Sequence, residues 1–348
     1  MTGQIGQTVL LEGHWYDAVV SLLDAGQPAD LPAGQRARAR ELAVAARRIL
    51  DLDAEDFGEL ASNFSSAWGA RLAAASFPLE PRDPQRGALG SLTELYELML
   101  EVLELRALRA EPLQIVVTAH LIGEYLAQLA WQPVLGHGGD PLRMAESIGS
   151  GTRWGTDDPD CPHSSALRAT ARRSLHACSG DRAGYTAYLD RFHSRLGEAL
   201  TLCAMNHVTV GAGERPDVGE TCPNPCAFAT AGDLATRRDL DARVRLARIY
   251  AGSPIVNLRH HAPVGHFFGV PSVGEISQAW IATWEKLQTP WADGENPLLA
   301  DDLAHKAEPG EALPGMAALV SAVAGRPMGP GRLIRDIGAE LTSVLEGA

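Results

Sequence analysis

Residues 112–131, PLQIVVTAHLIGEYLAQLAW, form the most apolar stretch of the chain and decide the fold class. Proline is favoured at the first position of a helix, so Pro112 predicts the start of one. A helix that is apolar on all sides is normally buried. We therefore expect one long helix that runs through the core of the protein.

Helical periodicity continues on both sides of this stretch. Residues 34–50 and 91–110 place Leu, Met and Val at steps of three and four residues between charges. Ser91 with Glu94 matches a capping box, and Ser272 is expected to cap a later helix. Further helices are predicted at about 164–178, 181–206, 232–250 and 272–288, followed by two amphipathic helices near the C-terminus. The sequence predicts an all-α protein.

We expect a single helical domain over residues 1–348, with a small N-terminal helical lobe at 1–85 and the core at 86–348. Two long irregular loops, at 149–163 and 208–231, interrupt the helical pattern. Loops of this length in compact domains are often functional.

Charge and composition limit the classes of partner. The net charge is −13 and the pI is about 5.3, which opposes binding to nucleic acids or anionic membranes, because both need a basic face. No apolar run of membrane-spanning length and no secretory signal is recognised. With five cysteines, an odd number, the expected location is a reducing cytoplasm.

Three of the eleven histidines, His260, His261 and His266, fall within seven residues. Imidazole is the commonest side-chain ligand for iron and other metals. The cluster is either a ligand site or a structural group, and the residues alone leave both readings open.

His120 lies in the middle of the apolar stretch, with Glu124 one helical turn later on the same face. Burying an imidazole and a carboxylate costs several kcal/mol unless they pair or meet a ligand. The structural alternative is a single hydrogen bond that ties the helix to itself.

Two other groups give weaker signals. Cys161, His163, Cys222 and Cys226 could together form a zinc site, although the prolines between the last two cysteines suit a rigid turn equally well. Asp157 and Asp158 lie in a loop without a partner motif, so we interpret them as a solvated turn. The sequence contains no glycine-rich phosphate loop, GxSxG elbow or HExxH motif.

The two histidine regions resemble the tryptophan-dioxygenase superfamily of histidine-ligated heme enzymes. Residues 115–124 keep the His-to-Glu step of the family's distal helix at His120 and Glu124, with one extra residue before the histidine. Arg259, His260, Val264 and Gly269 keep the spacing of the proximal motif R-H-x-x-x-V-x-x-x-x-G. The Gly/Thr/Ser-rich substrate loop does not follow Gly269, and Pro263 would disturb a proximal helix.

With these two departures, the sequence more closely resembles a divergent branch of the superfamily, the heme-dependent tyrosine hydroxylases of natural-product pathways. In the covalent-heme members of that branch a histidine is followed by His-x-x-x-Cys. His266 and His305 could occupy the two histidine positions, but Pro309 stands where the cysteine should be. The resemblance therefore implies heme b bound without a covalent link.

The resemblance implies a monooxygenase that converts the phenol ring of tyrosine or a derivative to a catechol in antibiotic biosynthesis, with hydrogen peroxide or O2. Either His260 or His266 would ligate the heme iron, with Arg259 and His305 also at the cofactor. His120 and Glu124 would act in acid–base catalysis, and Arg153 with Trp154 would bind the amino-acid substrate. The chain could be a homodimer.

Two alternatives stay open. One is a non-heme metal enzyme that uses His260, His261 and His266 with a carboxylate such as Glu275. The other is a non-catalytic helical binding protein in which the histidines are structural.

Overall fold

The computed structural model describes residues 9–64, 66–80, 83, 85–135, 140, 142, 165–166, 169, 181, 183–191, 197, 233–262, 265, 269–292, 296–300 and 311–347. Within these ranges every regular element is an α-helix or a 3-10 helix, which confirms the all-α prediction. The first helices are α2 (Tyr16–Asp24), α3 (Ala33–Leu50), η1 (Ala54–Asp56), α4 (Phe57–Ser62), α5 (Ser66–Ala75) and α6 (Leu92–Leu108). They are followed by α7 (Pro112–Glu124), α8 (Leu126–Leu135), α13 (Leu234–Ala251), α14 (Pro254–Asn257), η3 (Leu258–His261), α15 (Val273–Leu287), η4 (Pro297–Leu299), α16 (Met316–Ala324) and α17 (Leu333–Glu346).

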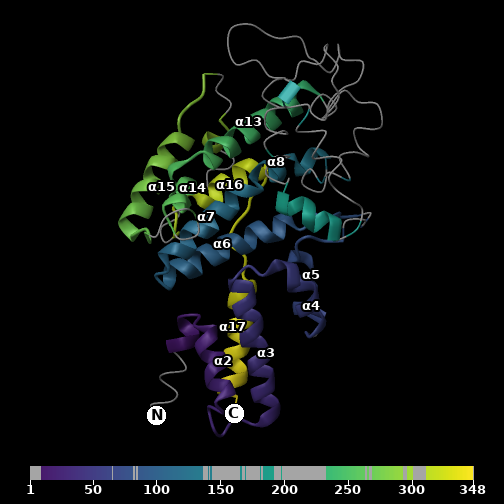
Figure 1. Ribbon diagram of the computed structural model, residues 1–348, viewed down its shortest axis with the longest axis vertical. Coiled ribbons are helices and arrows are strands. Elements are labelled where there is room, and N and C mark those ends of the chain that lie inside the picture. Colours follow the sequence, from purple (N-terminus) through teal and green to yellow (C-terminus); the bar gives the residue numbers. More distant parts are fainter. Residues whose placement is uncertain are drawn as a thin grey trace.

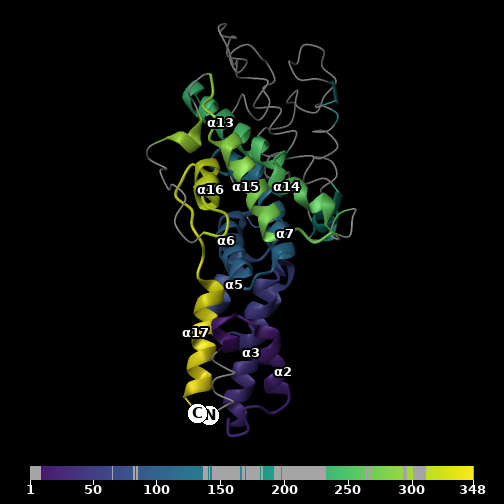
Figure 2. The same cartoon turned by 90° about the vertical axis from the view of Figure 1, so that its left-hand side faces the viewer.

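The described helices form two hydrophobic clusters. One cluster joins α2, α3, α4 and α5 to α17, and we call this part the lobe. The other joins α7, α8, α13, α15 and α16, and we call it the core. The two parts lie end to end in Figures 1 and 2, with the lobe at the lower end. The C-terminal helix α17 packs along α3 in the lobe, although the sequence division at residue 85 grouped it with the core.

Helix α6 contributes side chains to both clusters. Leu98 and Val102 belong to the lobe cluster, whereas Tyr96 and Leu103 belong to the core cluster. Residues three to four apart share one face of a helix, so two faces of α6 are buried at once. This explains why α6 is apolar on most of its circumference.

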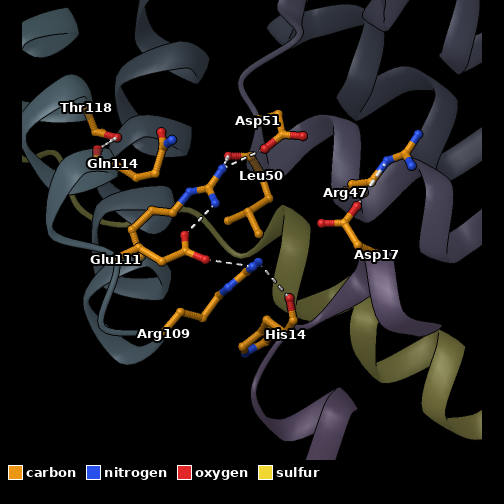
Figure 3. A network of polar contacts seen from close by, with 10 residues as sticks. His14, Asp17, Arg47, Leu50, Asp51, Arg109, Glu111, Gln114 and Thr118 are labelled. Atoms are coloured by element: carbon orange, nitrogen blue, oxygen red, sulfur yellow. Dashed lines mark hydrogen bonds and ion pairs between the residues drawn. The ribbon is translucent and has the colours of Figure 1, made fainter. Parts of the chain in front are cut away.

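Arginines at the end of α6 hold the junction between lobe and core. Arg106, which is almost fully buried, donates to Glu111, to the Leu50 carbonyl and to Asp51 at 2.6, 2.9 and 2.7 Å. Arg109 bridges Glu111, at 2.7 Å, and the carbonyl oxygen of His14, at 3.1 Å (Figure 3). Charged groups tolerate burial when they are paired and hydrogen-bonded in this way.

The apolar stretch 112–131 is not one continuous helix, which corrects the sequence prediction. It forms α7, with Pro112 in its first turn, and then α8, with a turn at Tyr125 between them. The Tyr96 hydroxyl donates to the Ile122 carbonyl at 2.7 Å. That carbonyl lies in the last turn of α7, where no intrahelical donor is available.

By length and composition, the segment Pro112–Pro133, which covers α7 and most of α8, could cross a membrane. No other helical segment in the described part of the chain meets this criterion. Half of the most apolar window of Pro112–Pro133 is buried inside the protein, in the core cluster. A buried core helix meets the same criterion, and we interpret the segment in that way.

Two capping predictions had opposite outcomes. Ser272 caps the start of α15, as predicted, and it does so in a reciprocal capping box with Glu275. Ser91 precedes α6 but makes no side-chain cap, and Glu94 instead accepts a bond of 2.8 Å from Arg86. The Ser91–Glu94 capping box was therefore wrong.

The two helices predicted near the C-terminus also differ in kind. In α17 the buried residues recur every three or four positions, so the helix is amphipathic, as predicted. In α16 all nine residues are buried, so this helix is not amphipathic. It begins after Gly315, whose φ of 93° is left-handed and whose α-carbon lies against Trp284, so a Cβ there would be 2.2 Å from the Trp284 ring.

Candidate active site

The candidate site is a cavity in the core. Its volume is about 450 Å³, within the usual range for small-molecule sites. Its wall comes from α7 and α8, the end of α13, the α14–η3 segment and Gly197. The lining residues are His120, Gly123, Glu124, Ala127, Gly197, Ala247, Arg248, Ala251, Gly252, Val256, Asn257, Arg259 and His260. The structure thus brings together four predicted site residues: His120, Glu124, Arg259 and His260.

Helix α7 supplies an acid–base pair to the cavity. Nε2 of His120 lies 2.8 Å from Oε1 of Glu124, one turn later on the same helix. The two side chains are only 14% and 21% exposed, so the contact is partly shielded from water. This is the hydrogen bond that the structural alternative predicted, and it lies on a cavity wall rather than in closed packing.

The second ring nitrogen of His120 is one of several buried side-chain atoms that lack a hydrogen-bond partner within the described residues. Nδ1 is buried and has no hydrogen-bond partner among the described residues. A buried polar atom without a partner costs free energy, and most native structures avoid it. With Glu124 accepting at Nε2, the tautomer that fits has its proton on Nε2 and a lone pair on Nδ1.

Helix α13 forms the facing wall. Asp233 caps its start by accepting from the Thr236 amide at 2.8 Å. The small side chains of Ala247 and Ala251 line the cavity near the end of the helix. The hydroxyl of the fully buried Tyr250 donates to the Ala119 carbonyl at 2.6 Å and so ties α13 to α7. Burial raises the pKa of Tyr250, which keeps this hydroxyl a neutral donor.

The α14–η3 segment presents Arg259 and His260. Ser253 precedes α14, and the chain then tightens into the 3-10 turn η3 instead of a longer helix. His260 lines the cavity and is half-buried, whereas its neighbour His261 is exposed. Gly265 packs against this turn so closely that a Cβ would lie 2.3 Å from the Arg259 carbonyl oxygen. Glycine at this position therefore allows the chain to fold back on the Arg259–His260 turn.

Several lining residues were missed by the sequence analysis. Arg248 reaches the cavity from α13, and Gly123 and Ala127 give it space along α7 and α8. The spacing from Ala247 to Ala251 puts small residues on one helical face, which is a weak signal because alanine is common in helices. Helix α13 contains several other arginines, and no sequence pattern distinguishes Arg248 from them.

Several other residues that the sequence analysis discussed lie outside the described residues. They are Arg153, Trp154, His266 and His305, together with Asp157, Asp158 and the zinc candidates Cys161, His163, Cys222 and Cys226.

The described ranges contain no group of three or more His, Cys, Asp or Glu side chains placed to hold a metal ion. Glu275, the carboxylate suggested for a non-heme metal site, is engaged in the α15 capping box at 2.8 Å from the Ser272 amide. Its hydrogen bonds to Ser272 lower its pKa. Within the described part, Glu275 has a structural role.

Comparison with known proteins assigns no family: no family model, curated protein or solved structure matches this chain.

Proposed function

We propose that this protein is a heme-dependent monooxygenase that converts the phenol ring of tyrosine or a tyrosine derivative to a catechol. The observation that carries the proposal is the shared cavity of His120, Glu124, Arg259 and His260. These residues come from chain segments about 140 positions apart, and they are the residues that the sequence resemblance assigns to the two sides of a heme.

The residues of the cavity fit a flat, dianionic cofactor. Gly123, Ala127, Ala247 and Ala251 leave room between α13 and the α7–α8 pair, where larger side chains would close the gap. Arg259 supplies a cationic group for a carboxylate at its edge. His260 supplies an imidazole, the usual protein ligand of heme iron. His266, which lies outside the described residues, is the alternative ligand.

When bound, heme would supply the oxidation chemistry. With hydrogen peroxide, one oxygen atom enters the ring C–H bond and the other leaves as water, so no further reductant is needed. O2 as the oxidant would require an electron donor in addition. A catechol product is consistent with a role in antibiotic biosynthesis, which the resemblance implies.

The chain's own contribution is proton transfer and positioning. Glu124 accepts a hydrogen bond from Nε2–H of His120 and so fixes the ring orientation. A carboxylate and an imidazole that share one proton can take a proton from one oxygen of the oxidant and return it to the other. The half-buried position of the pair restricts competing water.

The first test is the heme itself. The purified protein, supplied with hemin, should show a Soret band. His260→Ala should lose or shift this band, whereas His261→Ala, which changes the exposed neighbour, should keep it. If His260→Ala keeps the wild-type spectrum and His266→Ala loses it, His266 is the ligand. Unchanged spectra in both variants, or no Soret band in the wild type, would contradict the proposal.

The second test separates catalysis from cofactor binding. His120→Ala should keep the Soret band but lose about 10²–10⁴-fold in turnover of tyrosine to catechol. Glu124→Gln should show a smaller loss, because the imidazole remains but loses its carboxylate partner. Full activity in His120→Ala would leave His120 as a structural residue.

The third test concerns attachment. Acid–acetone should extract the pigment, and the denatured chain should have the mass of the polypeptide alone, 37.1 kDa. A mass increase of one heme after denaturation would show a covalent link and contradict this prediction.

A further inference from the structure

A second hollow lies beside the candidate active site. It is an open groove of about 470 Å³ between the last turns of α13 and the end of α15. Its lining residues are Arg245, Arg248, Ile249, Gly252, Lys286 and Trp291. Helices α13 and α15 contact each other in the core, so both walls are built on regular elements.

The charge of this groove opposes the charge of the whole chain. Among the six described residues that line it, three are cationic and none is acidic, on a chain whose net charge is −13. Buried Asp241 compensates Arg245, whose Nε lies 2.9 Å from the carboxylate. Lys286 is exposed and forms no ion pair with any described residue. Clefts lined by one sign of charge concentrate ligands of the opposite sign.

The groove is lined in part by the flat ring of Trp291, whose position is fixed by its neighbours. The Arg245 guanidinium carbon lies 4.6 Å from the centroid of the Trp291 ring, in a cation–π contact. Asp241 also pairs with this guanidinium, and Trp291 packs against the core cluster. Ile249, one residue after Arg248, adds an apolar surface next to the ring. A flat apolar group therefore finds a ready surface beside two cationic side chains.

We propose that this groove binds a small organic anion. Its acidic group, a carboxylate or a phosphate, lies between Arg248 and Lys286, and its flat apolar part lies against Trp291 and Ile249. Arg248 and Gly252 also line the active-site cavity, so a ligand in the groove lies at the rim of that cavity. The inference rests on the groove alone and does not require the chain to bind heme.

The test uses the full-length protein and three probes: 3-(4-hydroxyphenyl)propionate, phenyl phosphate, and the neutral amide of the first compound. Binding is followed at the indole N–H signal of Trp291 in ¹H–¹⁵N spectra, assigned with Trp291→Phe. At least one anion should shift this signal saturably, and the amide should bind at least about 10-fold more weakly, because it lacks the charge-assisted contact. The tighter of the two anions identifies the acidic group.

Variants test the two cations. Lys286→Gln and Arg248→Gln should each weaken the anion by about 10-fold, the loss expected for one charge-assisted hydrogen bond. Arg332→Gln, at an exposed arginine before α17 in the lobe, should bind like the wild type. Equal binding of amide and carboxylate, no shift of the Trp291 signal with either anion, or wild-type affinity in both groove variants would overturn the inference. The Soret band is measured separately, so its absence leaves this result unaffected.

Discussion

The lobe and the core use small side chains for opposite purposes. In the lobe, Ala39, Ala43 and Ala46 of α3 are completely buried, and α2 and α17 pack closely on this helix. In the core, Gly123 and Ala127 lie on the wall of a cavity. Small residues between helices allow close approach when the neighbours can move in, and leave space when the neighbours are held apart. Their presence in a sequence does not by itself distinguish the two cases.

Arg106 and His120 differ in how their buried polar atoms are satisfied. At the lobe junction, the Arg106 guanidinium has three acceptors within 2.9 Å. In the core, Nδ1 of His120 has none among the described residues. Satisfied networks stabilise a fold, whereas a buried group without a partner calls for an explanation, such as a ligand or a water molecule. Nε of Arg109 at the junction also lacks a partner within the described ranges, so the case for His120 rests on its position in the wall of a cavity.

The largest effect is expected from Arg106→Ala. The substitution leaves the Leu50 carbonyl without its buried donor and leaves Glu111 with Arg109 as its remaining arginine partner, which should lower the free energy of unfolding by about 3–5 kcal/mol. Urea denaturation followed by circular dichroism measures this loss. Arg48→Ala removes a more exposed arginine paired with Asp53 at 2.8 Å and should cost about 1 kcal/mol or less. Equal losses in the two variants would contradict a special role for the junction.

A matched pair of substitutions tests the two uses of alanine. Ala43→Leu places a larger side chain in the closed α3 interface and should destabilise the protein by about 1–3 kcal/mol. Ala127→Leu adds the same atoms at the cavity wall and should change stability by less than about 1 kcal/mol, because the space is already there. Thermal denaturation measures both changes.

The same pair separates stability from binding. Ala127→Leu should reduce hemin uptake, measured by the Soret band, whereas Ala43→Leu should leave uptake unchanged in the folded fraction. The comparison fails if Ala127→Leu destabilises the chain as much as Ala43→Leu does.

The local features of the structure could be predicted from the sequence. The helix predicted at 34–50 is α3, Ala33–Leu50, and the helix predicted at 272–288 is α15, Val273–Leu287. Apolar periodicity and a capping box are local signals, and they work where the helix ends depend on nearby residues. The pairing of His120 with Glu124 also follows from a spacing of four.

The non-local parts could not be predicted in this way. The turn at Tyr125 coincides with the Tyr96 hydroxyl bond to Ile122, which joins two helices. The position of α17 beside α3 depends on which apolar face closes the lobe, and no local pattern encodes that choice. Arg248 was missed because only the folded chain brings it to the cavity that holds His260. His120 and His260 were singled out from the apolar stretch and the histidine cluster, and the family resemblance assigned them to one site. The fold places both on one cavity.

The smallest effect is expected from His14→Asn, which tests a titratable group on the lobe side of the junction. Nδ1 of His14 lies 2.8 Å from the Tyr16 hydroxyl, and the residue has a left-handed φ of 55° that asparagine tolerates. Burial, followed by the positive charges of Arg335 and Arg109, lowers the pKa of His14 below its ordinary 6.5. The unfolded chain therefore binds a proton more readily than the folded chain does.

The sign of the pH effect follows from this difference. The neutral imidazole contributes its full stability above about pH 6.5, and the contribution is lost as the pH falls from 6.5 toward the lower pKa of the folded state. Between pH 7 and pH 5, the wild type should lose more stability than His14→Asn, by about 1 kcal/mol or less. Urea denaturation at several pH values measures the difference. Parallel pH profiles for the two proteins would show that His14 does not couple protonation to the lobe–core junction, whose arginines would then act only through their ion pairs.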